Sequence, residues 1–408
     1  MHNAVTSHDG NLFIEGVALE TIATQYGTPS YVYSKAAISS NFLAYQTALA
    51  EKDHLICYAV KANSNIAVLQ TLAELGAGFD IVSSGELERV IRAGGDPAKV
   101  VFSGVAKSAA EMRRALELGI HCFNVESEAE LELLNATAAA IDLPAAVSLR
   151  VNPDVDAQTH PYISTGLKEN KFGIDINLAP QVYQRAAQMS HINIVGVDCH
   201  IGSQLVDIDP FVAALERLLM LVDQLAKLGI SLQHIDIGGG LGVRYETEQP
   251  PSADNYMSAI LPLLEGRSET LVLEPGRSIT ANAGVMLTQV QYLKSNGDKN
   301  FAIVDGAMND MIRPALYQAW MDIQPVSSGT AETHNYDVVG PVCETGDFLA
   351  KDRSLAISAG DYLCLFSAGA YGFVMSSNYN SRTRAPELMV DGDQVHIIRQ
   401  RETVEDLL

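Results

Sequence analysis

LICYAVKAN, residues 55–63, is an apolar run that leads directly into a lysine. Residues 55–60 have the near-continuous apolar character of a strand that is buried on both faces, and Lys61 stands at its carboxyl end. Asn65 then opens a helical pattern that runs to Gly76. A lysine at the tip of a strand is usually a solvated end residue. Lys61 therefore becomes informative only if other strand tips bring complementary chemistry to the same place.

From residue 36 onward, apolar runs rich in β-forming residues alternate with helical patterns. The predicted strands are residues 55–60, 79–82, 100–102, 122–125, 147–151, 192–199, 232–237 and 271–273. Eight strand–helix units in succession favour a (β/α)8 barrel. The competing arrangement is a doubly wound open sheet, which is weakened because no G-x-G-x-x-G motif follows the first strand.

The predicted helices carry start and stop signals. Ser83, Ser108 and Ser127 are each followed three residues later by glutamate, which is the form of a capping box. Asp209 and Pro210 open a further helix with a cap and a proline at its first position, and Gly229 ends it.

After about residue 278 the pattern changes to β-structure. Residues 285–293 and 300–304 flank an Asn-Gly turn, and residues 388–390 and 395–398 flank an Asp-Gly turn, so each pair predicts a hairpin. Further strands are expected at 336–339 and 362–366. The early strands at 10–17 and 31–33, separated by a helix at 19–26, are expected to complete this unit. The predicted domains are therefore a barrel at 36–278 and an all-β (sandwich- or barrel-like) domain made of 1–35 and 279–408.

Composition excludes several classes of protein. The chain has 408 residues and a net charge of −22, which disfavours binding to nucleic acid or an anionic membrane because phosphates would be repelled. No apolar run is long enough to span a membrane, and the N-terminus has no signal-peptide pattern. The five cysteines form no C-x-x-C pair and no zinc spacing. We therefore expect a cytoplasmic protein with neither disulfides nor a structural metal.

Polar residues gather at the carboxyl ends of the predicted strands. In a (β/α)8 barrel these ends form one face, and active sites lie there. The residues concerned are Lys61 at the first strand, Asp80 at the second, HIGSQ (200–204) at the sixth, DIGGGLG (236–242) at the seventh and EPGR (274–277) at the eighth. Each is ambiguous alone, since a lone lysine is most often a surface residue and a glycine run is often only a flexible loop.

Together these groups match the needs of one cofactor. A glycine-rich turn that leads into a helix exposes N–H groups to a phosphate, and Ser203 and Arg277 add donors. A lysine in a partly apolar pocket can form a Schiff base with an aldehyde. A glutamate such as Glu274 can pair with a protonated pyridine nitrogen, and an imidazole such as His200 can stack on a flat ring. Phosphate, aldehyde and pyridine together describe pyridoxal 5′-phosphate.

The chain as a whole resembles the barrel-type (fold type III) pyridoxal-phosphate-dependent decarboxylases of basic amino acids. The motifs that carry the resemblance are YAVKAN (58–63), HIGS (200–203), DIGGG (236–240), EPGR (274–277), DG (305–306), RPALY (313–317), GPVCETGD (340–347) and GAYG (369–372). Within this family the sequence is most similar to the diaminopimelate decarboxylases. Ornithine decarboxylases typically have aspartate after the cysteine, where this chain has Glu344, and HPYISTG (160–166) is similar to a mobile loop of the diaminopimelate enzymes.

The resemblance implies roles for the residues that would hold the cofactor. Lys61 would carry it, His200 would stack on its ring and Glu274 would face the pyridine nitrogen. The residues implied around the phosphate are Ser203, Gly239, Gly240, Gly276, Arg277 and Tyr371. Asp80 is placed near the cofactor by its position alone.

The resemblance also implies how the substrate is held. Arg277, Arg313, Tyr317 and Tyr371 would bind its distal end, Glu344 would read the distal ammonium group, and Cys343 would donate a proton across the interface of a homodimer. The other four cysteines lie in apolar runs and are expected to be inert.

The implied reaction is decarboxylation of meso-2,6-diaminopimelate to L-lysine and carbon dioxide, the last step of lysine biosynthesis. The alternatives are a decarboxylase of ornithine, arginine or a carboxylated polyamine such as carboxynorspermidine, an amino-acid racemase on the same barrel, and a non-catalytic regulatory homologue. Residues 160–166 are further predicted to act as a lid.

Overall fold

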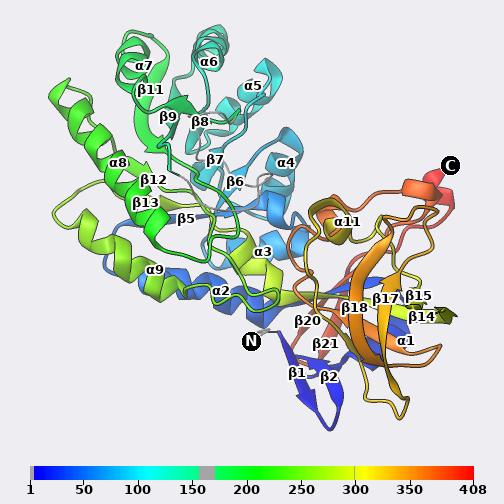
Figure 1. The fold of residues 1–408 in the computed structure, drawn as a ribbon. Coiled ribbons are helices and arrows are strands. Elements are labelled where there is room, and N and C mark those ends of the chain that lie inside the picture. The colour runs from blue at the N-terminus through cyan, green and yellow to red at the C-terminus, as the bar shows by residue number, and fades with distance from the viewer. Residues whose placement is uncertain (1–3, 156–170, 298) are drawn as a thin grey trace. The chain divides into compact units, whose positions relative to one another are not determined.

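The computed structural model describes residues 4–155, 171–297 and 299–408 (Figure 1). The chain divides into two compact units, which are treated separately below. The barrel unit comprises Phe42–Gly242 and Gln249–Arg277, and the β unit comprises Met1–Asn41, Val243–Glu248 and Ser278–Leu408. The predicted division at residues 36 and 278 remains a proposal about which segments fold as domains.

Parallel strands form the barrel unit. They are β5 (His54–Ala59), β6 (Gly78–Ile81), β7 (Val100–Phe102), β8 (Cys122–Val125), β9 (Ala145–Asn152), β11 (Ile192–Asp198), β12 (His234–Asp236) and β13 (Thr270–Leu273). Their order is β9-β11-β12-β13-β5-β6-β7-β8, and pairing of β8 with β9 closes the sheet. The short β10 (Ile174–Asp175) pairs with the end of β9. The (β/α)8 prediction is confirmed, and each of the eight predicted strands lies where it was expected.

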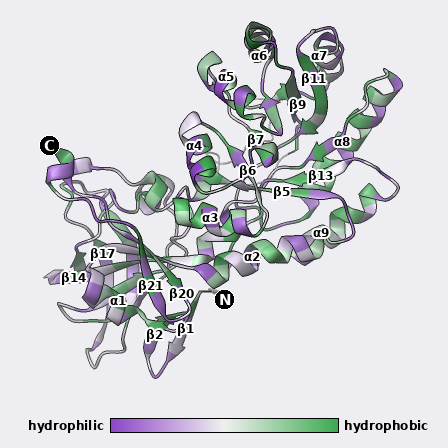
Figure 2. Cartoon of the chain, turned by 180° about the vertical axis from the view of Figure 1, so that it is seen from behind, coloured by the Kyte–Doolittle hydropathy of each residue, from purple (hydrophilic) through white to green (hydrophobic). Residues whose placement is uncertain are grey.

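Helices lie around the outside of the barrel, and all but α2, which precedes β5, follow a strand of the barrel (Figure 1). They are α2 (Lys35–Ala48), α3 (Ile66–Glu74), α4 (Ser84–Arg92), α5 (Ala109–Leu118), α6 (Glu128–Ile141), α7 (Ala179–Ala186), α8 (Asp209–Lys227) and α9 (Ala253–Ile260). Purple and green alternate along α8 and α9 in Figure 2, as expected of helices that bury one face. Among the described residues, no helix combines the length and the hydropathy that a membrane crossing requires.

Helix capping differs in detail from the prediction. Ser83, Ser108 and Ser127 each accept a hydrogen bond from the backbone N–H three residues on. Only Ser108 forms a complete capping box with its glutamate. The glutamates that follow Ser83 and Ser127 instead accept from the N–H one residue before the serine. Asp209 was wrongly predicted as a cap, because it is the first helical residue and the N-cap position is Ile208.

The β unit is built on a second sheet in the order β18-β17-β15-β14-β4-β20-β21, with β19 pairing β14 and β16 pairing β19. Its strands are β4 (Ser30–Ser34), β14 (Gly284–Asn296), β15 (Lys299–Val304), β16 (Ile323–Pro325), β17 (Thr333–Val339), β18 (Phe348–Ala356), β19 (Tyr362–Leu365), β20 (Glu387–Asp391) and β21 (Gln394–Arg399). The hairpins β14–β15 and β20–β21 were predicted and are confirmed.

The N-terminal segment contributes to the β unit in two ways. Strand β4 pairs with both β14 and β20, so this early strand does complete the main sheet, and α1 (Leu19–Tyr26) has the predicted bounds. Residues 10–17 do not join that sheet. They fall in a separate three-stranded sheet of β1 (Val5–His8), β2 (Asn11–Ile14) and β3 (Val17–Ala18). A single bridge between Asn11 and Ser327 links β2 to a segment of the β unit far along the chain.

Short helical segments join these elements. They are α10 (Arg277–Thr280), α11 (Arg313–Tyr317), η1 (Val60–Ala62), η2 (Pro97–Lys99), η3 (Leu261–Leu264), η4 (Ala281–Ala283), η5 (Phe373–Met375), η6 (Tyr379–Ser381) and η7 (Glu405–Leu407). The 3₁₀ turn η1 matters most for the site, because it follows β5 directly and contains Lys61.

Candidate active site

Lys61 lies at the carboxyl end of the barrel and is held by an acidic partner. Its amine forms an ion pair with the carboxylate of Asp80, which is fully buried on β6, while the lysine side chain is 37% exposed. Burial, and next the neighbouring Glu274, raise the pKa of Asp80, and Lys61 opposes that rise. The amine is therefore both anchored and accessible at the mouth of the barrel.

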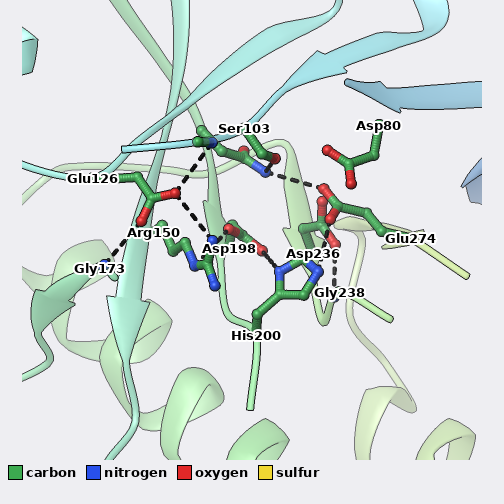
Figure 3. A network of polar contacts seen from close by, with 12 residues as sticks. Asp80, Ser103, Glu126, Arg150, Gly173, Asp198, His200, Asp236, Gly238 and Glu274 are labelled. Carbon is green, nitrogen blue, oxygen red and sulfur yellow. Dashed lines mark hydrogen bonds and ion pairs between the residues drawn. The ribbon is translucent and has the colours of Figure 1, made fainter. Parts of the chain in front are cut away.

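His200 lies between two buried carboxylates that come from different strands. Its Nε2 is 2.9 Å from Oε2 of Glu274, and its Nδ1 is 3.4 Å from Oδ1 of Asp198 (Figure 3). Burial alone lowers the pKa of His200, but the charges of Glu274 and Asp198 outweigh that effect and raise the pKa to about 9. The imidazole is therefore cationic at neutral pH.

Glu274 is fixed from its other side by an amide. Asn124, fully buried on β8, donates from Nδ2 to Oε1 of Glu274 at 3.1 Å and contacts Oγ of Ser103 at 3.3 Å. Glu274 is itself only 2% exposed, although it lies just after β13 at the strand tip. Both of its oxygens thus have defined directions, as a group that must present one oxygen to a ligand requires.

A series of buried side chains that alternate in charge connects to His200 through Asp198. Arg150 on β9 donates to Glu126 at 3.0 Å and lies 3.9 Å from the carboxylate of Asp198. Glu126 is held by further N–H groups, including that of Gly173 at 2.9 Å (Figure 3). The order Glu126, Arg150, Asp198, His200 and Glu274 alternates in sign, so each buried charge has an opposite neighbour.

Sequence reasoning missed four members of this network, namely Asn124, Glu126, Arg150 and Asp198. Each lies within, or one residue beyond, a strand that was identified by its apolar character. The available signal was that a lone polar residue in a buried strand needs a partner, and that several such residues fall near carboxyl ends.

The turn after β12 is a backbone cradle that only glycine can form. A side chain at Gly239 would place its Cβ 2.2 Å from the carbonyl oxygen of Glu274, and one at Gly240 would lie 2.7 Å from the carbonyl of Gly202. Gly240 also has φ of 111°, which side chains rarely adopt. At Gly276 a Cβ would meet the methyl carbons of two alanines at 3.0 Å. The close packing requires glycine at these positions, and a turn without side chains leaves its N–H groups uncovered for an anion.

Ser203 and Arg277 meet beside this cradle. The guanidinium of Arg277 donates from Nη2 to Oγ of Ser203 at 3.0 Å and from Nε at 3.3 Å. Arg277 is 7% exposed and begins α10. The barrel unit thus contains all the predicted cofactor residues except Tyr371.

The β unit holds the remaining predicted residues. Arg313 and Tyr317 lie on α11, and the guanidinium of Arg313 is 4.3 Å from the ring centre of Tyr245. Tyr371 has φ of 55° in the loop after β19. Arg313 is 6% exposed, so a charge is held against an aromatic face inside this unit.

Cys343 and Glu344 lie on an exposed loop between β17 and β18 of the β unit. The carboxylate of Glu344 accepts a hydrogen bond from the hydroxyl of Tyr379, and the N–H of Cys343 is 3.5 Å from Oδ1 of Asn380. Both partners belong to η6, so η6 contacts this loop at two consecutive residues. The predicted lid at 160–166 lies outside the described residues.

The barrel site fits a phosphorylated pyridine aldehyde. A lysine amine, a buried carboxylate with both oxygens oriented, an imidazole and a glycine cradle occur together at one end of one barrel. One ligand atom each from Asp198, His200 and Glu274 also lie within 4.8 Å of one another, a spacing that a metal ion would tolerate. The accessible lysine and the anion cradle favour the aldehyde, since a metal uses neither.

Comparison with known proteins agrees with this chemistry. A family model described as the pyridoxal binding domain of pyridoxal-dependent decarboxylases matches residues 35–281. The diaminopimelate decarboxylase of Pseudomonas aeruginosa is 66% identical, covering 98% of this chain and 96% of that protein. The corresponding protein of Aquifex aeolicus is 48% identical, covering 97% of this chain and 94% of that protein.

Solved structures agree over the full length of the chain. The diaminopimelate decarboxylase of Helicobacter pylori, complexed with L-lysine, has a TM-score of 0.92 at 44% identity, covering 95% of this chain and 98% of that chain. The M. jannaschii enzyme in complex with L-lysine has a TM-score of 0.95 at 38% identity, covering 100% of this chain and 97% of that chain. A lysine/ornithine decarboxylase of Vibrio vulnificus has a TM-score of 0.81 at 24% identity, covering 92% of this chain and 97% of that chain, and shares the fold alone.

Proposed function

The chain belongs to the diaminopimelate decarboxylases, and from that premise we propose that it converts meso-2,6-diaminopimelate to L-lysine and carbon dioxide. This is the last step of lysine biosynthesis, and the cofactor is pyridoxal 5′-phosphate. The observation that carries the proposal is the convergence of Lys61, Glu274 and the glycine cradle at the carboxyl end of the barrel.

Bound at this site, pyridoxal phosphate would supply an aldehyde that links to an amine and a ring that accepts the electron pair left when carbon dioxide departs. Lys61 is the amine in reach of that chemistry, and its ion pair with Asp80 keeps it near the site until it is displaced. Glu274 would hold the proton of the pyridine nitrogen. Its burial and its contact with Asn124 suit this role, because a buried carboxylate favours a cationic partner.

We propose that the remaining barrel residues fix the cofactor in one orientation. His200 would stack on the ring, with Asp198 and Arg150 holding its imidazole in place. The phosphate would bind to N–H groups of the cradle and to donors beside it. The residues assigned to the phosphate are Ser203, Gly239, Gly240, Gly276, Arg277 and Tyr371.

The substrate has two amino-acid ends, of which only one reacts. The spectator end carries a carboxylate and an ammonium group, so its site needs both cations and an anion. Arg277 and Arg313 would clamp the carboxylate and Glu344 would pair with the ammonium, with Tyr317 and Tyr371 alongside. Ornithine lacks the distal carboxylate, so it would leave a buried guanidinium unpaired and would be rejected.

We propose that the enzyme is a homodimer with shared sites. The supporting observation is that Cys343 and Glu344 are exposed on a loop of the single chain, where a partner's barrel can receive them. The thiol of Cys343 would donate a proton to the carbon that has lost its carboxyl group as carbon dioxide. All five cysteines are free, which suits a reducing, cytoplasmic location.

Carbon dioxide release is the direct test. The purified enzyme with pyridoxal phosphate is assayed on the meso, LL and DD stereoisomers of diaminopimelate, with ornithine and arginine as competitors. Release from the meso isomer alone supports the proposal. Faster release from ornithine would replace it with the sister activity, and release from none of them would favour a non-catalytic homologue.

The role of Glu344 distinguishes a diaminopimelate decarboxylase from an ornithine decarboxylase. Replacement Glu344→Asp retains the charge but shortens its reach, so we expect KM for diaminopimelate to rise about tenfold, with a smaller change in kcat. An unchanged KM would remove Glu344 from the substrate site.

A further inference from the structure

A second group of chemically capable side chains lies at the amino ends of two barrel strands. Cys122 is the first residue of β8, His121 precedes it, and His234 is the first residue of β12. These are the amino ends of strands, whereas the site described above occupies carboxyl ends. One ligand atom from each of the three residues lies within 4.8 Å of the others. The proposed decarboxylation uses none of them.

The spacing is close to that of a coordinated metal. Sγ of Cys122 is 4.0 Å from Nε2 of His234, and the ring centres of His121 and His234 are 5.2 Å apart. Around a tetrahedral zinc, with bonds of about 2.0 Å to nitrogen and about 2.3 Å to sulfur, the sulfur–nitrogen distance is about 3.5 Å. The observed sulfur–nitrogen pair therefore needs to close by only about half an ångström.

The hydrogen bonding of His121 leaves one ring nitrogen for a ligand. His121 hydrogen-bonds the carbonyl of Ala98, and its buried Nε2 has no hydrogen-bond partner among the described residues. The donor is therefore Nδ1, which leaves the lone pair of Nε2 available, as in metal sites where a carbonyl fixes the tautomer.

The sheet is built to admit the imidazole of His234. This residue is 2% exposed and pairs with Gly196 of β11, where a Cβ would lie 2.0 Å from its Nε2. The register of β11 against β9 also shifts between Ile194 and Gly196. A side chain at Gly196 would clash with the imidazole of His234, so glycine is required at this position.

We propose that His121, Cys122 and His234 bind Zn²⁺ at the amino end of the barrel. Three protein ligands leave a fourth position for water. Binding exchanges the thiol proton of Cys122 for the metal, so that Zn²⁺ and the neutral thiol give a zinc thiolate and one released proton. Strands β8 and β12 are not neighbours in the sheet, so the metal would tie them together across the barrel. This departs from the sequence-based expectation of no structural metal.

The test uses the full chain loaded with pyridoxal phosphate, so that the cofactor site is filled. Protein expressed with added Zn²⁺ is washed with a weak chelator, and its zinc content and thermal midpoint are measured. Cd²⁺ then replaces zinc, and its thiolate charge-transfer absorption in the ultraviolet reports a sulfur ligand. We expect one metal per chain and a higher thermal midpoint with metal.

Matched variants identify the ligands. Cys343→Ser removes the exposed thiol and is expected to leave metal content and the charge-transfer band unchanged. Cys122→Ser is expected to abolish the band, and His121→Gln to weaken Zn²⁺ binding by more than about 100-fold. His121 is only half-buried, so His121→Gln serves as the test if Cys122→Ser does not fold.

Two results would overturn the proposal. One is zinc content in the washed protein no higher than in His121→Gln. The other is a band that persists in Cys122→Ser and disappears in Cys343→Ser, which would assign the metal to the exposed thiol. Neither readout depends on decarboxylation, so the metal site and the proposed function can fail separately.

Discussion

The apolar core of the barrel and the carboxyl ends of its strands are made from the same strands and are opposite in character. Cys57, Val101, Cys122, Val195 and Val272 form an apolar core cluster whose members are at most 6% exposed. At the carboxyl end, Asp80, Asp198, Asp236 and Glu274 are at most 2% exposed, and each brings a carboxyl group into the interior. Removing charge from water costs several kcal/mol per ion unless partners compensate. Stability is therefore expected to reside in the apolar core cluster and chemistry at the carboxyl ends of the strands.

Strand β5 shows the change within a few residues. Cys57 belongs to the apolar cluster, and Lys61, in the turn that follows, pairs with Asp80. Burial raises the pKa of Cys57, so its thiol stays neutral, while the amine four positions on remains in contact with a carboxylate. This short segment thus contributes Cys57 to the packed core and Lys61 to the reactive site.

The largest expected effect is at Lys61. Lys61→Ala should reduce kcat by at least about 10⁴-fold, as removal of a covalent group does, because Lys61 is the amine proposed to link to the cofactor. Steady-state release of carbon dioxide measures it. The control is Lys99→Ala, just before the amino end of β7, which should leave kcat unchanged. An equal loss of kcat in Lys61→Ala and Lys99→Ala would mean that the position of Lys61 has no special function.

The buried ion pair of Lys107 and Glu130 gives the next effect, on stability. The pair is at 2.6 Å with both side chains at most 6% exposed. Lys107→Met should lower the free energy of unfolding by about 3–5 kcal/mol, since it leaves a buried carboxylate unpaired. Urea denaturation measures it, and Glu130→Leu added to Lys107→Met should recover part of the loss. No recovery would contradict the charge explanation.

The charge on His200 predicts a pH dependence at the carboxyl end. Its pKa is raised from 6.5 to about 9, so its stabilisation is full below pH 6.5 and is lost as pH rises through about 9. The expected loss between these limits is about 3 kcal/mol, from 1.36 kcal/mol per pKa unit. Urea denaturation of the cofactor-free chain from pH 6 to pH 10 measures it. His200→Asn should flatten the curve, and an unchanged slope would contradict the assignment.

A truncation in the apolar core cluster is expected to affect stability without affecting chemistry. Val272 is fully buried in the apolar cluster. Val272→Ala should cost about 2 kcal/mol of unfolding free energy, from lost burial and the cavity left behind, while kcat changes less than about twofold at a temperature where the variant is folded. A large fall in kcat in a variant that is still folded would show that packing in the core cluster affects the active site.

Helix capping gives the smallest effect. Ser108→Ala removes the hydroxyl that accepts from the Glu111 N–H and donates to the Glu111 carboxylate, and should cost about 1 kcal/mol. Ser83→Ala removes only the serine's own bond, because its glutamate caps Val82 instead, so its cost should be smaller. Thermal unfolding of the two variants side by side measures the difference. A larger loss for Ser83→Ala would contradict the capping analysis.

The local sequence pattern was sufficient to predict the strands of the barrel but not the polar network inside it. Apolar runs and glycine-rich turns are properties of single segments, so the eight barrel strands and the two hairpins could be predicted. Asn124 and Arg150 acquire meaning only when β8 and β9 pair and the barrel closes. Strand β18 was missed because Phe348–Ala356 mixes apolar residues with Lys351, Asp352 and Arg353, which one exposed sheet face permits.

The roles assigned to the predicted site residues remain predictions of a different kind. The barrel unit brings Lys61, Asp80 and Glu274 together, as the strand-tip argument required. For Arg313, Cys343 and Glu344 the structure gives contacts within the β unit, and their substrate roles rest on the family. Spacing along the chain could not have supplied those roles, because the partners are far apart in sequence.

Chemical trapping tests the central claim most directly, that Lys61 at the carboxyl end of the barrel holds the cofactor. Borohydride reduction of the loaded enzyme makes the lysine–aldehyde linkage permanent, and peptide mass spectrometry then locates the pyridoxyl group. The account predicts a single modified peptide carrying the group on Lys61. A pyridoxyl group on Lys107 or on a lysine of the β unit, with Lys61 unmodified, would contradict it.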